Sequence, residues 1–169
     1  MDCIYNGIDI SEESINFAKK NYGSLTNVSF QVYEGKKIPF ENNTFDLVFM
    51  SCVMHHIKSD DHKSIIEECK RVLKDNGLII IFEHNPNNPL TLKAVNTCPF
   101  DKDAVLLKSK QLKNLFVSCG LKDVLVRYTI FIPRKGILEK LTFIEKFLYW
   151  LPIGGQYYIV GKKQSNKVI

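Results

Sequence analysis

Stretches with strand spacing alternate with stretches of helical spacing over the first half of this 169-residue chain, and this order constrains the fold more than any other feature. The predicted strands are residues 3–10, 28–32, 47–50 and 78–82. The run Leu47–Met50 is continuously apolar, which is typical of a strand covered on both faces. Helices between such strands place the strands parallel, with right-handed crossovers. The pattern therefore predicts an α/β fold.

Capping residues set the ends of the two predicted helices. Ser11, followed by Glu12 and Glu13, provides an N-cap and an acidic first turn, and Gly23 ends that helix. The second helix begins at residues 60 and 61. Its predicted buried stripe is Ile65, Ile66, Cys69, Val72 and Leu73. Asp75-Asn76-Gly77 then predicts a turn into the strand 78–82.

The second half of the chain departs from this alternation. Residues 84–100 contain three prolines and several asparagines, and we interpret them as a long irregular connection that forms an active-site loop. The elements predicted after it are a helix at 109–119, a strand at 124–132 ended by Pro133, a helix at 136–150 and a strand at 156–161. Because no repeat or linker interrupts the chain, we expect residues 1–169 to form a single domain.

Composition excludes several classes of protein. The net charge of +5 comes from scattered lysines, so we expect no nucleic-acid partner. The five cysteines form no C-x-x-C pair and are interpreted as reduced, mostly core residues. No stretch approaches the roughly 18 apolar residues of a spanning helix, and nothing near Met1 resembles a signal peptide. We therefore expect a cytoplasmic protein without a membrane span.

Several segments, in order, resemble the class I, Rossmann-like S-adenosylmethionine-dependent methyltransferases. These segments are 5–11, 34–40, 44–48, 51–57 and 73–82. Later segments, at 83–91, 98–101 and 150–158, resemble a bacterial subgroup linked to surface-polysaccharide biosynthesis. Each motif is weak alone, but their order over most of the chain is specific. The resemblance implies a mostly parallel sheet with an antiparallel C-terminal strand.

The resemblance also implies where S-adenosylmethionine binds. Asp9 and Ile10 end the strand whose acidic residue accepts hydrogen bonds from the ribose hydroxyls in the family. Glu34, where relatives more often have Asp, and Gly35 correspond to the adenine-side loop, and Ser51 begins the segment that lines the cleft. From the residues alone, Asp9 has a second role open to it, as a cap for the next helix.

Histidines and an acid at the predicted strand ends are the candidates for proton transfer. A histidine titrates near pH 6.5, so His56 or His55 can act as a general base, and Glu83 is the third candidate. The alternative is that the histidine pair shapes the pocket or caps a helix. His84 lies nearby, but the spacing of these residues matches no familiar ligand pattern, and we expect no metal.

The family's first strand and its glycine-rich turn have no counterpart here. No G-x-G occurs in the chain, and the resemblance begins at the family's second strand. That turn lets the backbone approach the cofactor, and its strand lies in the middle of the sheet. Three explanations stay open: the chain is a fragment, a second copy or a partner chain completes the sheet, or the chain is a relative without methyl transfer.

The subgroup resemblance implies a small-molecule or glycan-type methyl acceptor. The apolar helix expected at 136–150 is interpreted as core, as a lid or as a peripheral membrane contact. Two other classes of function remain. A nicotinamide-dependent oxidoreductase would need its own glycine fingerprint. A catalytically silent methyltransferase-like partner would fold without binding the cofactor.

Overall fold

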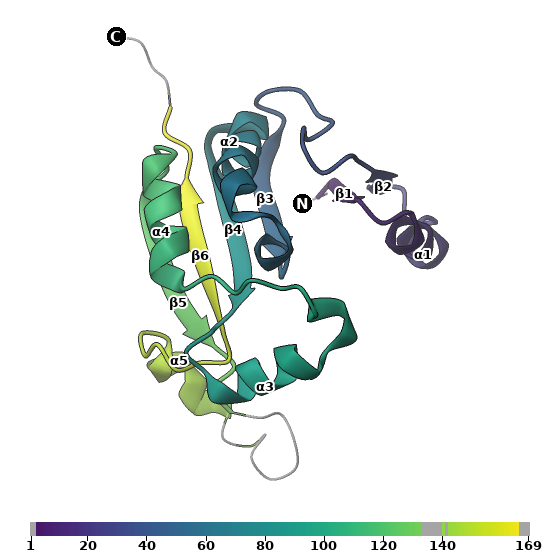
Figure 1. Ribbon diagram of the computed structural model, residues 1–169. Coiled ribbons are helices and arrows are strands. Elements are labelled where there is room, and N and C mark those ends of the chain that lie inside the picture. Colours follow the sequence, from purple (N-terminus) through teal and green to yellow (C-terminus); the bar gives the residue numbers. More distant parts are fainter. Residues whose placement is uncertain (1–2, 133–139, 141, 166–169) are drawn as a thin grey trace. The chain divides into compact units, whose positions relative to one another are not determined.

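The computed structural model describes residues 3–132, 140 and 142–165, and they fall into two units, 1–41 and 42–169. In the first unit, strand β1 (Tyr5–Asp9) and strand β2 (Val28–Val32) pair in parallel and are joined by helix α1 (Glu12–Tyr22). This confirms the predicted βαβ order (Figure 1). The Ser11 hydroxyl accepts a hydrogen bond from Ser14 N at 3.2 Å, so the predicted N-cap is confirmed.

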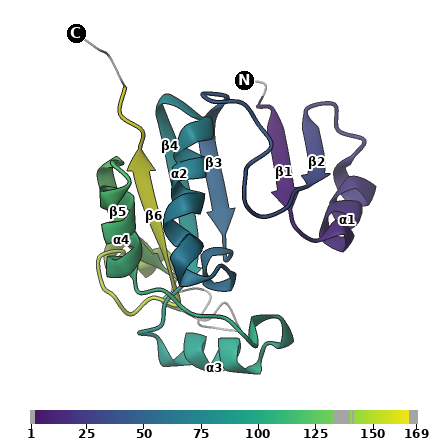
Figure 2. The same cartoon turned by 45° about the horizontal axis from the view of Figure 1, so that its top comes forward.

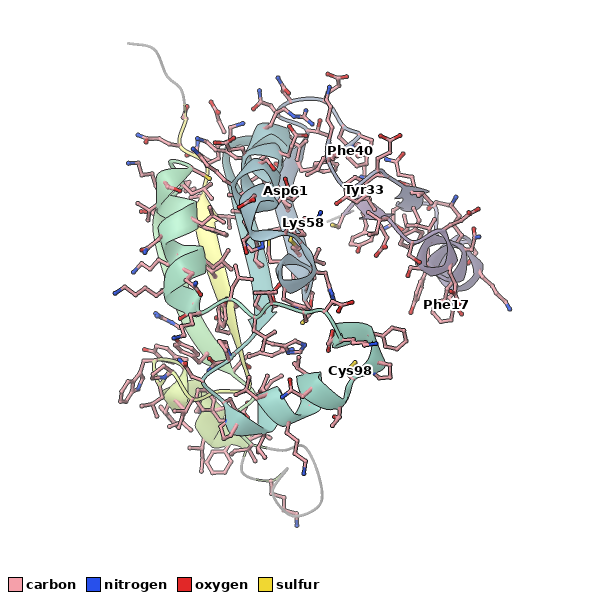
Figure 3. All side chains as sticks on the ribbon, viewed as in Figure 1. Phe17, Tyr33, Phe40, Lys58, Asp61 and Cys98 are labelled. Carbon is pink, nitrogen blue, oxygen red and sulfur yellow. The ribbon has the colours of Figure 1, made fainter. Side chains whose placement is uncertain are left out.

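Packing in the first unit is light. Ile15 is the buried residue of α1, whereas Phe17 on the same helix is 68% exposed (Figure 3). Tyr5 and Phe30 make an edge-to-face contact across the two strands, with ring centroids 6.0 Å apart. A two-stranded sheet with one helix buries little apolar area.

The second unit contains a four-stranded sheet in the order β3-β4-β6-β5. Its strands are β3 (Phe45–Ser51), β4 (Leu73–His84), β5 (Lys122–Thr129) and β6 (Gln156–Lys162). β3 and β4 are parallel, and β6 is antiparallel to both of its neighbours. The expected mostly parallel sheet with an antiparallel C-terminal strand is confirmed. Asn76, at the predicted turn, has a φ of 65°, a value that Asn tolerates.

Helices α2 (His62–Val72) and α4 (Ser109–Ser118) lie side by side on one face of this sheet (Figures 1 and 2). The predicted stripe of α2 is confirmed. Each of its members is at most 4% exposed: Ile65, Ile66, Cys69, Val72 and Leu73. From α4, Phe116 packs so closely on β6 that a side chain at Gly161 would lie 2.7 Å from its ring. This layer is the core of the unit.

The opposite face of the sheet is half-exposed. Leu47 and Phe49, on β3, are 50% and 55% exposed. Phe82 lies on this face, between Phe49 and Tyr158, with ring centroids 5.7 and 5.0 Å away. The expectation that Leu47–Met50 is covered on both faces is therefore wrong for the described residues, because α2 and α4 cover only the other one.

The connection after β4 is more regular than its composition suggests. Instead of an irregular loop, residues 84–100 contain helix α3 (Pro89–Thr97), and the 3₁₀ helix η3 (Pro99–Asp101) follows. The Asn88 side chain accepts hydrogen bonds from Leu90 N and Thr91 N, and Pro89 takes the first helical position, where its missing N–H does no harm. The prediction of an irregular loop is therefore wrong.

Of the predicted helix 136–150, the structure has α5 (Glu145–Leu148), while residues 133–139 and 141 lie outside the described residues. The remaining elements are two 3₁₀ turns, η1 (Met54–His56) and η2 (Ser59–Asp61). Within the described part of the chain, no helix combines the length and the apolarity needed to cross a bilayer.

Candidate functional site

A cluster of histidines and carboxylates forms beyond the carboxyl ends of β3 and β4. The two strands are parallel, with Ser51 opposite Phe82, so the residues that follow them meet at one edge of the sheet. After Ser51 the chain turns sharply through Cys52, whose φ is 54° and whose N–H donates to Phe82 O at 2.9 Å. The turn places η1 directly beside Glu83, the second-to-last residue of β4.

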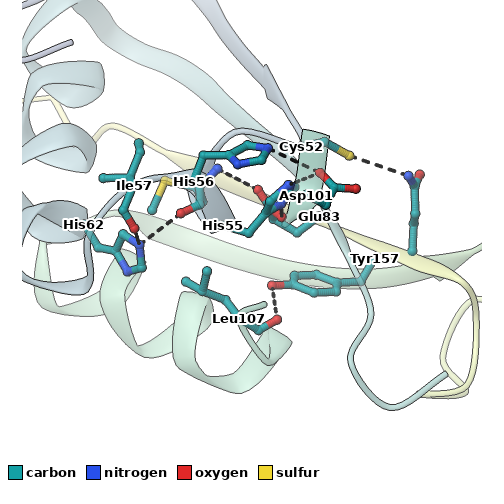
Figure 4. A network of polar contacts seen from close by, with 11 residues as sticks. Cys52, His55, His56, Ile57, His62, Glu83, Asp101, Leu107 and Tyr157 are labelled. Atoms are coloured by element: carbon teal, nitrogen blue, oxygen red, sulfur yellow. Dashed lines mark hydrogen bonds and ion pairs between the residues drawn. The ribbon is translucent and has the colours of Figure 1, made fainter. Parts of the chain in front are cut away.

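Glu83 is fully buried and both of its oxygens are used. Oε1 accepts a hydrogen bond from Met54 N at 2.8 Å, and Oε2 accepts one from His55 Nδ1 at 2.6 Å (Figure 4). A buried carboxylate needs such donors to be tolerated. Glu83 therefore holds the His55 ring with its Nδ1 toward the core and its Nε2 pointing away from β4.

Asp101, at the end of η3, approaches the histidine pair from the other side. Its Oδ1 lies 3.5 Å from His55 Nε2 and 3.4 Å from His56 Nε2. The His55 side chain is 1% exposed, whereas that of His56 is 43% exposed. His55 Nε2 is buried without a hydrogen-bond partner among the described residues, and Asp101 Oδ1, 3.5 Å away, is the nearby acid.

The charges around the cluster shift the pKa of two histidines in opposite directions. Burial alone would lower the pKa of His55, but the hydrogen bond to Glu83 and the negative charges of Glu83 and Asp101 outweigh it, and the pKa is raised from 6.5. The pKa of His84 is lowered, first by burial and then by the positive charge of His55, whose ring lies 5.2 Å away. The surroundings thus favour the cationic form of His55 and the neutral form of His84.

Further hydrogen bonds fix the backbone around the cluster. His62 Nε2 lies 3.0 Å from Met54 O and 2.9 Å from Ile57 O, which joins α2 to η1. Val105 N donates to His55 O at 2.9 Å, so the segment after η3 is tied to the histidine pair. An open cleft of about 430 Å³, lined by residues 95–99, 101, 102 and 104, reaches Asp101 from α3.

The structure brings the predicted catalytic residues together but adds one that sequence reasoning missed. His55, His56 and Glu83 are neighbours as expected, and His84 lies beside them. The missed residue is Asp101, which the sequence places only in the segment 98–101 that resembles the subgroup. An acid two residues after Pro99, directly after the connection 84–100 that is interpreted as an active-site loop, was the available signal.

The predicted cofactor residues lie in both units. In the first unit, Tyr33 N donates to Asp9 O at 3.0 Å, and a side chain at Gly35, whose φ is +78°, would lie 3.2 Å from Ile10 Cγ2. Asp9, Ile10 and Gly35 thus gather at the carboxyl ends of β1 and β2. Asp9 Oδ1 also accepts from Ser11 N at 2.8 Å, which matches the capping alternative.

The other two predicted cofactor residues are solvent-accessible. Glu34 is exposed in the first unit. Ser51 is exposed at the end of β3 in the second unit. The cofactor roles of these residues stay predictions.

Comparison with known proteins finds a methyltransferase family and methyltransferases among the relatives. Residues 2–81 match the family described as methyltransferase domain. An uncharacterized protein of Methanocaldococcus jannaschii is 30% identical, over 74% of this chain and 59% of its own length. A demethylmenaquinone methyltransferase of Staphylococcus epidermidis is 27% identical, over 72% of this chain and 58% of its own length. The chain thus spans about three fifths of the length of these curated relatives.

Solved structures share the fold. A SAM-dependent methyltransferase of Thermotoga maritima superposes with a TM-score of 0.71 at 21% identity, covering 95% of this chain and 73% of that one. Phosphoethanolamine N-methyltransferase 2 of Haemonchus contortus, in complex with S-adenosyl-L-methionine, gives 0.66 at 19% identity, covering 95% and 43%. The fold is the Rossmann-like fold of SAM-dependent methyltransferases, and the comparisons support S-adenosylmethionine as the cofactor.

Proposed function

We propose, from the match of residues 2–81 to a methyltransferase domain and from the shared fold, that this chain is a SAM-dependent methyltransferase or part of one. The observation that carries the catalytic part of the proposal is the buried Glu83–His55 pair with Asp101 and the half-exposed His56 in front of it. Direct displacement at a sulfonium methyl group requires alignment of the two reactants and removal of a proton from an oxygen or nitrogen acceptor. The cluster supplies groups for the second task.

His56 is the proton acceptor in this proposal. Its side chain is the one in the pair that solvent reaches, and Asp101 Oδ1 at 3.4 Å stabilises the imidazolium that forms. His55 and Glu83 support it from behind, because the two rings lie 4.2 Å apart and the 2.6 Å hydrogen bond fixes the inner one. Glu83 is too buried to touch a substrate and acts as a positioning residue.

Asp9, Ile10, Glu34, Gly35 and Ser51 form the proposed cofactor contacts. The residues fit this role: Asp9 is an exposed acid at the end of a parallel strand, and Gly35 lacks the side chain that would crowd Ile10. S-adenosylmethionine supplies the activated methyl group. The Asp9 carboxylate would accept hydrogen bonds from its ribose hydroxyls, and the segment around Glu34 would contact the adenine.

The acceptor is proposed to be a small molecule or a glycan. The open cleft next to Asp101 has room for a group of that size, and the histidine cluster suits a hydroxyl or an amine. The resemblance to the polysaccharide-linked subgroup supports the glycan.

Calorimetric binding of S-adenosylhomocysteine tests the cofactor part of this proposal. We expect micromolar binding that Asp9→Ala abolishes and that Glu12→Ala, an exposed acid in the first turn of α1, leaves unchanged. Binding that survives Asp9→Ala would assign that residue to capping alone. A folded chain that binds no S-adenosylhomocysteine would contradict the proposal and support the silent methyltransferase-like partner.

A further inference from the structure

We propose that His55, His56 and Asp101 form a binding site for a divalent transition-metal ion, with Zn²⁺ as the ion that fits best. The three residues offer one ligand atom each, and these atoms lie within 4.8 Å of one another. The inference goes beyond methyl transfer, since it requires only these side chains. It departs from the sequence-based expectation of no metal.

The buried nitrogen of His55 is the observation that distinguishes this cluster from an ordinary surface group of acids and histidines. The His55 side chain is 1% exposed, and its Nε2 has no hydrogen-bond partner among the described residues. This nitrogen points toward Asp101 and His56. An unpaired buried nitrogen of this kind costs stability. A metal ion at this position would satisfy it.

Two of the three distances between the ligand atoms match a tetrahedral ion. With bonds of about 2.0–2.1 Å to nitrogen and oxygen, neighbouring ligands of four-coordinate zinc lie about 3.3–3.4 Å apart. An octahedral ion with bonds of that length would place them only about 2.8–3.0 Å apart. The observed separations from Asp101 Oδ1 are 3.5 Å to His55 Nε2 and 3.4 Å to His56 Nε2. The third pair, the two histidine nitrogens, lies within 4.8 Å, and a rotation of the half-exposed His56 side chain would bring these atoms closer together.

Glu83 completes the site as a supporting residue. Metal-binding histidines usually donate their other ring N–H to a carboxylate, which orients the ring and raises its basicity. The 2.6 Å hydrogen bond from His55 Nδ1 to Glu83 Oε2 has this form, and Met54 N holds the other oxygen of Glu83. Two imidazoles and one carboxylate favour zinc or a similar ion over magnesium or calcium.

Three protein ligands leave a fourth position open, which is typical of catalytic rather than structural zinc. Of the three ligands only Asp101 lines the cleft of about 430 Å³, so a water molecule or an oxygen of a bound acceptor would approach that position from the Asp101 side. The ion would occupy the nitrogen with which His56 accepts a proton in the proposed function. Added zinc is therefore expected to compete with that proton transfer.

Equilibrium dialysis with Zn²⁺ and absorption spectroscopy with Co²⁺ test the site in the full chain. We expect one Zn²⁺ per chain and, with Co²⁺, the intense visible absorption of a four-coordinate ion. Glu83→Gln removes a supporting partner and should weaken zinc binding by about 10–100-fold. His56→Gln and Asp101→Asn each remove a ligand and should weaken zinc binding by more than Glu83→Gln does. Asp103→Asn, at an exposed acid two residues after Asp101 and outside the three ligands, is the matched control and should leave binding unchanged.

Two results would overturn the proposal. One is a folded wild-type chain that binds neither ion. The other is binding that His56→Gln and Asp101→Asn leave intact, which would assign the ion to surface thiols such as the exposed Cys3 or the partly exposed Cys98, directly before η3 (Figure 3). Circular dichroism of each variant checks folding, and substitution of the half-exposed His56 should be tolerated. The readout is independent of S-adenosylhomocysteine binding, so the two proposals fail separately.

Discussion

Asn85→Asp tests how the end of β4 holds the segment that leads into β6. The Asn85 side chain is 1% exposed, and its Nδ2 donates to Pro152 O at 3.1 Å and to Gly154 O at 2.8 Å. An aspartate has nearly the same shape but, when ionised, offers no donor. The substitution therefore places a negative charge against two carbonyl oxygens inside the protein.

The size of the effect depends on pH. Burial and the two carbonyl oxygens disfavour the ionised form, so the pKa of the new carboxyl in the folded state is raised above about 3.9, its value in the unfolded chain. Below that pH the group is neutral in both states and still donates one hydrogen bond, so the loss is about 1 kcal/mol. As pH rises through the folded-state pKa, the loss grows to about 3–5 kcal/mol, as for an uncompensated buried charge.

Thermal unfolding followed by circular dichroism measures this effect. For a chain of this size each kcal/mol lowers Tm by about 2–4 °C, so the variant should lose about 6–20 °C at pH 7 and far less near pH 4. Asn88→Asp is the matched control. It also loses a donor, to Ile153 O at 2.7 Å, but that bond is exposed and water replaces it, while an acid still accepts the capping bonds from Leu90 N and Thr91 N, so stability should change by less than about 1 kcal/mol. Equal losses for both variants, or a loss independent of pH, would refute the reasoning.

Three further predictions concern the core. Burial raises the pKa of the fully buried Cys69 thiol to about 12, so Ellman's reagent should modify exposed Cys3 in the native chain and Cys69 only upon unfolding. Tyr157→Phe removes one buried hydroxyl donor and should cost about 1 kcal/mol in urea unfolding. Ile66→Ala, at a fully buried position of α2, should cost about 2–5 kcal/mol, and Phe49→Ala, on the half-exposed face, clearly less. A loss for Phe49→Ala equal to that for Ile66→Ala would contradict the assignment of the faces.

Elements set by local patterns could be predicted from the sequence. The stripe of α2 follows helical spacing, and Ser11 caps α1, because these features depend on residues within a few positions of one another. Helix α3 also begins with a local signal, but that signal was given the opposite meaning. Pro89 and the asparagines near it were interpreted as breaking structure, whereas Asn88 and Pro89 begin a helix.

Which faces of the sheet are buried depends on contacts between distant parts of the chain, and a local sequence pattern does not show these contacts. The apolar run in β3 is typical of a buried strand, but only one face of the sheet meets α2 and α4. Asp101 is a second case, since it follows His56 by 45 residues in the chain and approaches it only through the path of α3 and η3. Spacing between ligands could not indicate a site whose members come from separate elements.

Glu83 links the two proposals made for this cluster. Because both of its oxygens already accept hydrogen bonds inside the protein, it cannot also bind a substrate or an ion, and its effect must pass through His55. A glutamine in its place can accept from Met54 N but offers an amide group to His55, which favours the imidazole tautomer with the proton on Nε2. That tautomer cannot bind a metal ion through Nε2, whereas His56 and Asp101 remain in place. Glu83→Gln should therefore reduce zinc binding more than methyl transfer, because it removes the lone pair of a metal ligand but only the support behind the half-exposed His56, which separates the metal site from the general base.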